Sequence, residues 1–182
     1  MVSGWFLMVL VVCGLVGLQS AAEGDEDQRG LLQQLMARVE KLEEDRGKSQ
    51  VAFSASLVST VQWTDHGPFD TNTTLVFQRV KTNIGNAYDK ETGIFTAPVK
   101  GLYYIRFTGC VGKSGKLNAA VMKNGVNVFA IYNVPATRGT TSNGMTLALE
   151  EGDRLWVELW ANTSISDQSR LSTFSGFLVF PL

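Results

Sequence analysis

The chain carries few side chains that could perform catalysis or bind a metal. Its single histidine, His66, lies in segment 64–68, whose Gly-Pro ending is typical of a loop. A hydrolytic triad would place this imidazole beside a serine or cysteine and a carboxylate, yet the chain has no G-x-S-x-G nucleophile elbow. One histidine cannot form a multi-histidine metal site. We therefore predict no catalytic residue, no metal-ligand set and no enzyme activity.

Two further patterns resemble ligand sites but fall short of their requirements. Gly112-Lys113-Ser114 matches the end of a P-loop, but Phe107 stands where that motif needs its first glycine, and no helical pattern follows. We interpret the segment as a hairpin loop. Calcium needs clustered oxygen ligands. The pair Asp65 and Asp70 is a weak cluster by itself, so no cofactor is predicted and calcium binding is left open.

Two asparagines, Asn72 and Asn162, each begin an Asn-x-Ser/Thr sequon without an intervening proline. Both lie in polar, loop-like stretches. We predict that at least one is glycosylated in an extracellular protein, and chance occurrence of the motif is the alternative.

The first residues predict secretion. The stretch from Trp5 to Leu18 is apolar, and no charged side chain precedes Glu23. It is shorter than the roughly 20 residues that span a bilayer as a helix, and small residues follow it at the positions that a signal peptidase reads. We predict a signal peptide over residues 1–22, with a short membrane anchor as the alternative. Because no later segment is long and apolar enough to span, we expect a secreted, extracellular protein without membrane insertion.

Removal of the signal would leave Cys110 as a single thiol, since the other cysteine is Cys13. A thiol in an oxidising compartment is either buried or paired with another chain. Cys110 follows a strand-like run, so we predict a buried free thiol, and an intermolecular disulfide is the alternative.

Charge divides the remainder of the chain into two unlike parts. Residues 23–46 carry eight acidic and four basic side chains, whereas residues 47–182 carry nine acidic and twelve basic ones. The overall net charge of −1 gives no basic footprint for nucleic acid. We therefore expect an acidic N-terminal segment, a mildly basic main domain and no nucleic-acid partner.

The acidic segment contains a helical stripe. Leu32, Leu35, Val39 and Leu42 follow the 3-4-3 spacing of heptad a and d positions. We interpret residues 23–48 as an acidic linker and short coiled coil that supports oligomerisation. A single amphipathic helix packed on its own domain is the alternative, because only about two heptads are present.

From residue 49 onward, short alternating runs bounded by turn residues predict an all-β sandwich. Two of its strands, 102–107 and 174–180, are apolar on both faces. Alternation predicts Phe174, Leu178 and Phe180 on one face of the last strand. Because an antiparallel sheet usually has one wet face, we expect a second cover and favour another copy of the domain over a larger sandwich. The residues expected to point away from the core are Tyr104, Phe177 and Val179.

Residues 75–107 carry a recognisable signature. They contain N-x-G-x-x-Y-D at 83–89 and T-G-x-F-T-A-P at 92–98, and Lys123-Asn124-Gly125, Gly152-Asp153 and 174–178 follow in order. Over about residues 49–182 the chain resembles the C1q globular domain. The resemblance implies a ten-stranded jelly roll, shared with the tumour-necrosis-factor fold, that assembles as a homotrimer or as a hetero-trimer with related C1q-like chains. The residues it places in the family-motif core and trimer interface are Phe77, Tyr88, Phe95, Tyr103, Tyr104, Phe107, Phe174, Gly176, Phe177 and Val179.

No Gly-X-Y collagen repeat accompanies this domain. The chain is therefore similar to short-stalk C1q-like proteins, and the complement pathway's protease-bearing collagen stalk has no counterpart. We predict a trimeric recognition module for a microbial surface ligand or an extracellular protein receptor, first in innate immune pattern recognition. The alternative is a cerebellin-like or adiponectin-like ligand that bridges receptors. The expected ligand-facing segments are Lys113–Lys116, Asn133–Asn143 and Asn162–Arg170.

Overall fold

The computed structural model describes residues 28–47, 49–135 and 139–182. The chain divides into two units, Met1–Arg46 and Gly47–Leu182. The expected signal peptide, residues 1–22, lies outside the described residues.

Residues 28–47 form an α-helix, as the leucine stripe predicts. Strong helix formers occupy most of its positions, and the four stripe residues Leu32, Leu35, Val39 and Leu42 are all exposed along it. A helix of this length is marginal alone, so the coiled coil stays a prediction. Among the described residues, no helix combines the length and apolar character that crossing a bilayer requires.

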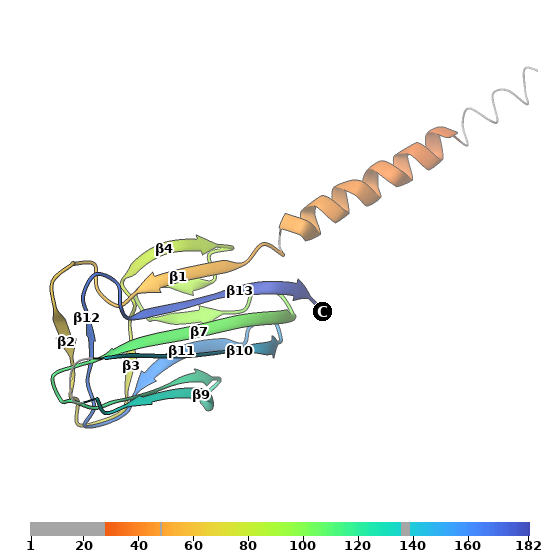
Figure 1. The fold of residues 1–182 in the computed structure, drawn as a ribbon. Coiled ribbons are helices and arrows are strands. Elements are labelled where there is room, and N and C mark those ends of the chain that lie inside the picture. The colour runs from red at the N-terminus through yellow and green to blue at the C-terminus, as the bar shows by residue number, and fades with distance from the viewer. Residues whose placement is uncertain (1–27, 48, 136–138) are drawn as a thin grey trace, which may run out of the picture. The chain divides into compact units, whose positions relative to one another are not determined.

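Two antiparallel sheets make up the main unit (Figure 1). The seven-stranded sheet has the order β2-β12-β7-β13-β1-β4, and β10 also pairs with β7. Its strands are β1 (Ala52–Ser56), β2 (Thr64–His66), β4 (Arg79–Ile84), β7 (Gly101–Val111), β10 (Thr140–Leu149), β12 (Ile165–Asp167) and β13 (Thr173–Pro181).

The six-stranded sheet has the order β5-β6-β11-β8-β9, and β3 also pairs with β11. Its strands are β3 (Thr73–Leu75), β5 (Tyr88–Asp89), β6 (Ile94–Thr96), β8 (Leu117–Lys123), β9 (Val126–Asn133) and β11 (Arg154–Leu159). Asn124 and Gly125 join β8 to β9 with φ of 49° and 88°, the left-handed pair that a tight hairpin needs. The all-β sandwich is confirmed. The described residues form thirteen strands rather than ten, because several two- and three-residue segments pair separately.

Aromatic side chains fill the space between the sheets. Phe53 lies at their centre, with its ring centroid 5.3 Å from that of Tyr88, 4.8 Å from that of Phe95 and 4.9 Å from that of Phe174. The Tyr88 hydroxyl donates to the Phe77 carbonyl oxygen at 3.2 Å, so this polar group is satisfied inside the core. Further family-motif side chains buried in this cluster are Phe77, Tyr103 and Phe107.

Different chain segments meet at the two ends of the sandwich. At the proximal end, where the domain's own termini lie, the Leu178 amide donates to Val51 and the Leu182 amide donates to Lys100. At the distal end the Val111 amide donates to Gly139, which brings this residue, just before β10, beside the end of β7. Figure 1 shows the C-terminus at the end away from β2 and β12.

One prediction about the last strand is wrong. Phe174 and Leu178 point inward, but Phe180 is exposed. The pairing of β13 with β7 shifts between Leu178 and Phe180, so Val179 is an extra residue, and Phe180 pairs with Leu102 instead of continuing the alternation. The bulge moves a third aromatic ring to the outer face of the sheet.

Candidate interaction surfaces

The outer face of the seven-stranded sheet carries an uncovered apolar row. Strand register places Ile84, Ala52, Phe177, Tyr104 and Thr146 in a line across β4, β1, β13, β7 and β10. The ring centroids of Tyr104 and Phe177 lie 5.7 Å apart. Phe177 is 48% exposed although it stands in the middle of the sheet.

A second row, nearer the proximal end, extends this apolar area. Leu102 and Phe180 face each other in register, and the bulged Val179 lies next to them and is exposed. Apolar groups that share one sheet face in two neighbouring rows form a contiguous patch of the kind that marks an interface. We name the patch formed by Ile84, Leu102, Tyr104, Phe177, Val179 and Phe180 the outer patch.

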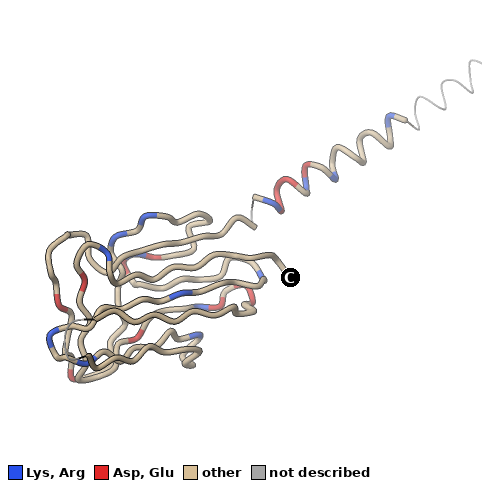
Figure 2. Tube along the Cα trace, viewed as in Figure 1, with Lys and Arg blue, Asp and Glu red and all other residues tan. Residues whose placement is uncertain are grey.

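The middle of the same sheet face is polar and almost uncharged. Strands β1, β10 and β13 contain no charged residue (Figure 2). Arg106 projects from β7 and donates to the Ser142 hydroxyl oxygen at 3.1 Å, and Ser54 and Ser175 lie in the same row. A face with few charges loses little solvation when another protein surface covers it. The outer patch and its surroundings therefore suit burial against a second copy.

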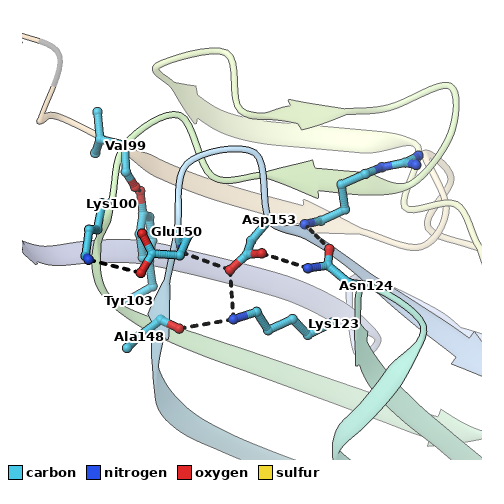
Figure 3. A network of polar contacts seen from close by, with 9 residues as sticks. Val99, Lys100, Tyr103, Lys123, Asn124, Ala148, Glu150 and Asp153 are labelled. Carbon is cyan, nitrogen blue, oxygen red and sulfur yellow. Dashed lines mark hydrogen bonds and ion pairs between the residues drawn. The ribbon is translucent and has the colours of Figure 1, made fainter.

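A polar network at the proximal end occupies the motif positions 123–125 and 152–153 (Figure 3). Asp153 is its centre. One carboxylate oxygen accepts from the Lys123 ammonium at 2.7 Å and from the Glu150 amide at 2.8 Å, and the other accepts from the Asn124 side chain at 2.7 Å. Partial burial tends to raise the pKa of Asp153, but these donors outweigh it and hold the pKa below its ordinary value.

The network connects three turns of the backbone. The Asn124 side-chain oxygen accepts from the Arg154 amide at 2.9 Å, which joins the β8–β9 hairpin to the start of β11. The Ala97 amide donates to Asp153 and the Gly152 amide donates to Ala97, which adds the connection that follows β6. The bonds drawn as dashed lines in Figure 3 thus all join groups of the protein to one another. These motif residues position the backbone and leave ligand binding to other surfaces.

The three segments expected to face a ligand lie together at the distal end. The Gly112 amide donates to Ser164 and the Ser164 amide donates to Lys116, so the Lys113–Lys116 loop packs on the start of segment Asn162–Arg170. Only part of the second segment, Asn133–Asn143, is a loop that the structure describes. The ends of Asn133–Asn143 belong to β9 and β10, and residues 136–138 lie outside the described residues.

Segment Asn162–Arg170 is also less open than the sequence suggests. Its middle is strand β12, whose residues are buried. The Asp167 carboxylate accepts from the backbone amides of Val58 and Ser172 at 3.1 and 3.2 Å, and the Ser166 hydroxyl donates to Val111. Buried polar side chains with internal partners are compatible with a strand. Only the two ends of this segment are exposed.

The two sequons lie close together, and the asparagine of each is exposed. The Asn72 amide nitrogen donates to Glu158 at 3.1 Å, and its oxygen accepts from the Ala161 amide at 3.0 Å. Asn162 is exposed one residue further along, in the left-handed region at φ 61°, and its backbone amide donates to Phe69. Both sequons therefore reach the surface at one edge of the six-stranded sheet.

Cys110 is buried and His66 is half-buried near the distal end. Cys110 is a free cysteine at 2% exposure, and its amide donates to the Ser172 hydroxyl oxygen at 2.9 Å. His66 ends strand β2 rather than lying in a loop, and burial lowers its pKa against the opposing influence of Asp167 and Asp65. Among the residues that the structure describes, its Nε2 has no hydrogen-bond partner. Within the described residues, no three His, Cys, Asp or Glu side chains come together in a way that could hold a metal ion.

Comparison with known proteins identifies the family. The model of the C1q domain matches residues 52–179. The chain belongs to the C1q-domain family. Its C1q domain is 36% identical over 135 residues to mouse complement C1q tumor necrosis factor-related protein 3, covering 72% of this chain and 52% of that protein. A human complement C1q subcomponent is 32% identical over 142 residues, covering 75% and 53%. The chain thus spans about half the length of these relatives.

Solved structures agree with the fold of the C1q domain. The globular domain of zebrafish complement 1qA protein superposes with a TM-score of 0.54 at 24% identity, covering 72% of this chain and 99% of that structure. Murine APRIL superposes with a TM-score of 0.54 at 16% identity, covering 70% and 96%. These likenesses establish the jelly-roll fold that C1q and tumour-necrosis-factor domains share.

Proposed function

We propose that this C1q-domain protein is secreted, assembles as a trimer and binds ligands multivalently without turning them over. The observation that carries the proposal is the outer patch, where Phe177 is exposed and the half-buried Tyr104 lies beside it, on a sheet face that a monomer would be expected to keep polar. The number three comes from the family's resemblance to the tumour-necrosis-factor fold. Copies joined through this face would present their distal ends together, which turns weak single contacts into avidity.

Innate immune recognition of a microbial surface ligand is the role that we place first. The main domain carries an excess of basic over acidic side chains, and two of the lysines, Lys113 and Lys116, lie exposed in a distal loop. Electrostatic attraction of this kind favours anionic ligands. Members of the C1q family are in general ligand proteins rather than enzymes. None of the residue sets described above supports catalysis.

The second role is a signalling ligand that bridges extracellular protein receptors. The observation in its favour is that the C1q tumor necrosis factor-related protein is more similar to this chain, at 36% identity, than the complement C1q subcomponent is, at 32%. A binding assay of the secreted protein on bacterial surfaces and glycans, run beside a crosslinking pull-down from extracellular fluid, separates the two roles. Retention on microbial polymers supports the first role, and capture of one membrane receptor supports the second.

Secretion and glycosylation belong to the same proposal. Expression of the full chain in a secretory cell should release protein that begins at Glu23 and carries sugar on Asn72, Asn162 or both. Peptide N-glycosidase treatment followed by mass spectrometry measures both features. Intracellular retention with an intact first segment would contradict secretion, and an unchanged mass would contradict glycosylation.

A further inference from the structure

The outer face of the six-stranded sheet ends distally in a row of two aromatic side chains and one amide. Leu117 and Ala119 of β8 are buried in the core, so the residue between them, Asn118, points outward. Tyr132 of β9 is in register with Asn118, and the Trp160 amide donates to the Asn118 carbonyl oxygen at 2.9 Å on the other side. Neighbouring strands lie about 4.8 Å apart. The rings of Trp160 and Tyr132 therefore flank Asn118 across three adjacent chain segments.

A cation completes this row. The Lys116 ammonium lies 5.9 Å from the centroid of the Tyr132 ring, within reach of a cation–π interaction. Tyr132 is 62% exposed, so most of its ring is open to a ligand. Lys113, three residues earlier, is exposed in the same loop.

The polar side chains of the row can still form hydrogen bonds and ion pairs with a ligand. Within the described residues, the side-chain amide of Asn118 and the ammonium groups of Lys113 and Lys116 make no hydrogen bond or ion pair. The Asn118 amide is half-buried, so water reaches it less freely than it reaches the lysines. Unpaired donors and acceptors beside an exposed ring are the elements from which a ligand site is built.

We infer that this row binds an acidic saccharide, with a sugar ring on Tyr132, its hydroxyl groups on Asn118 and its carboxylate on Lys116 and Lys113. Each side chain matches one feature of a hexuronic acid unit. The apolar C–H face of a pyranose packs on an aromatic ring. A side-chain amide offers both a donor and an acceptor to neighbouring hydroxyl groups. An ammonium pairs with a carboxylate through charge-assisted hydrogen bonds.

Acidic side chains also lie near the row. Asp65 belongs to β2, and its carboxylate accepts from the Lys113 amide at 2.9 Å. Glu158 is on the same sheet face as the row. It lies one row away, in register with Ala120, and its carboxylate accepts from Asn72. A carboxylate at this position repels an anionic ligand but does not occupy the row. Replacing it by glutamine should therefore strengthen saccharide binding.

The inference rests on the proposed recognition function, because it names the ligand class of that distal surface. A monovalent probe keeps the two separate, because its affinity for one site does not depend on how many copies assemble. The probe is a tetrasaccharide of galacturonic acid, titrated into the full secreted chain by calorimetry. A neutral glucose tetrasaccharide is the comparison ligand, and light scattering reports the assembly state of each sample.

Binding of the acidic probe, little binding of the neutral one and weaker binding at higher salt are expected. Tyr132→Ala and Lys116→Gln should each lower the affinity about tenfold, which corresponds to about 1.4 kcal/mol. The matched control Lys90→Gln removes an exposed lysine outside this face and should leave the affinity unchanged. Absence of binding to the acidic probe, equal binding of the neutral probe, or unchanged affinity in both site variants would each overturn the inference, whatever the assembly state.

Discussion

Tyr104 and Phe177 lie side by side on the outer face of the seven-stranded sheet, with ring centroids 5.7 Å apart and ring planes at 45°. They are register partners on β7 and β13, two long strands that pair through the middle of this sheet. Aromatic pairs of this kind contribute most when water is excluded from them. The exposure of Phe177 and the partial exposure of Tyr104 in one copy are the physical basis for expecting a second copy above them.

Substitution at this pair should disrupt assembly. Phe177→Glu would place a charge inside the proposed interface, where burying it without a partner costs several kcal/mol. We expect a monomer by light scattering in place of an oligomer. Tyr132→Glu adds the same charge to an exposed aromatic position on the other sheet and should leave the number of chains in the oligomer unchanged. If Phe177→Glu remains an oligomer, the interface between copies does not include the outer patch.

Asp153→Ala should destabilise the fold. It removes the acceptor for Lys123, the Asn124 side chain and the Glu150 amide together. Loss of hydrogen bonds to a charged and mostly buried group costs about 2 to 3 kcal/mol in the free energy of unfolding. The exposed ion pair of Lys100 and Glu150, at 3.0 Å, provides the control. Glu150→Gln should change the free energy of unfolding by at most about 1 kcal/mol in urea titrations.

The same carboxylate should contribute to acid unfolding. Because the pKa of Asp153 is held below its ordinary value of 3.8 in the folded protein, its stabilising contribution is present above pH 3.8 and is lost as the pH falls through the lower, folded-state pKa. Urea unfolding at a series of acidic pH values should show a smaller loss of stability in Asp153→Ala than in the unaltered chain. Parallel pH profiles for the two proteins would contradict this assignment.

Gly176→Ala should strain the core. A Cβ at this position would lie 2.6 Å from the Ile105 Cδ1 atom, 2.8 Å from the Phe53 Cε1 atom and 3.0 Å from the Tyr104 carbonyl oxygen. Overpacking of this kind costs about 1 to 3 kcal/mol, and thermal unfolding should show a lower midpoint. Ser175→Ala, one residue away on the outer face, should unfold close to the unaltered protein. Equal midpoints for both variants would show that the core yields more readily than these distances indicate.

Cys110 should remain a free thiol in the native protein. Its burial excludes reagents and partner thiols, because a disulfide forms only through an accessible thiolate. Ellman's reagent should react with one thiol per mature chain in guanidinium chloride and with almost none beforehand. A covalent dimer on a non-reducing gel would instead support the intermolecular disulfide.

The helical stripe should strengthen assembly without being needed for the fold. Leu35→Glu places a charge in the apolar stripe of the 28–47 helix, where its leucine is exposed in a single chain. We expect the oligomer to dissociate at a higher protein concentration than before, while the thermal midpoint of the β domain stays the same. Lys41→Glu, on the flank of the stripe, is the matched control. If dilution affects Leu35→Glu and the unaltered chain equally, the stripe does not act as a coiled coil.

The sequence predicts the sandwich well because its signals are local. Alternation along 102–107 places Tyr103 inward and Tyr104 outward, and the Asn124-Gly125 pair marks its hairpin. The same reasoning predicts the wrong face for Phe180, because the bulge at Val179 depends on how β13 pairs with β7. Alternation holds only while the ladder is regular.

Features that depend on distant partners were beyond sequence reasoning. Strand β12 has only three residues, and it exists through its pairing with β2 and β7, which are distant in the chain. The motif reveals Asp153 as a turn residue, but its bond to Asn124 spans 29 positions in the chain. The row of Trp160, Asn118 and Tyr132 likewise exists only through the register of separate strands.

Sedimentation equilibrium of the secreted chain at micromolar concentration tests the central proposal most directly. Burial of the outer patch between copies predicts a single species with three times the mass of one mature chain, unchanged by reducing agent because Cys110 is enclosed. A monomer at that concentration would contradict the proposal, since Tyr104 and Phe177 would then face water in the working protein.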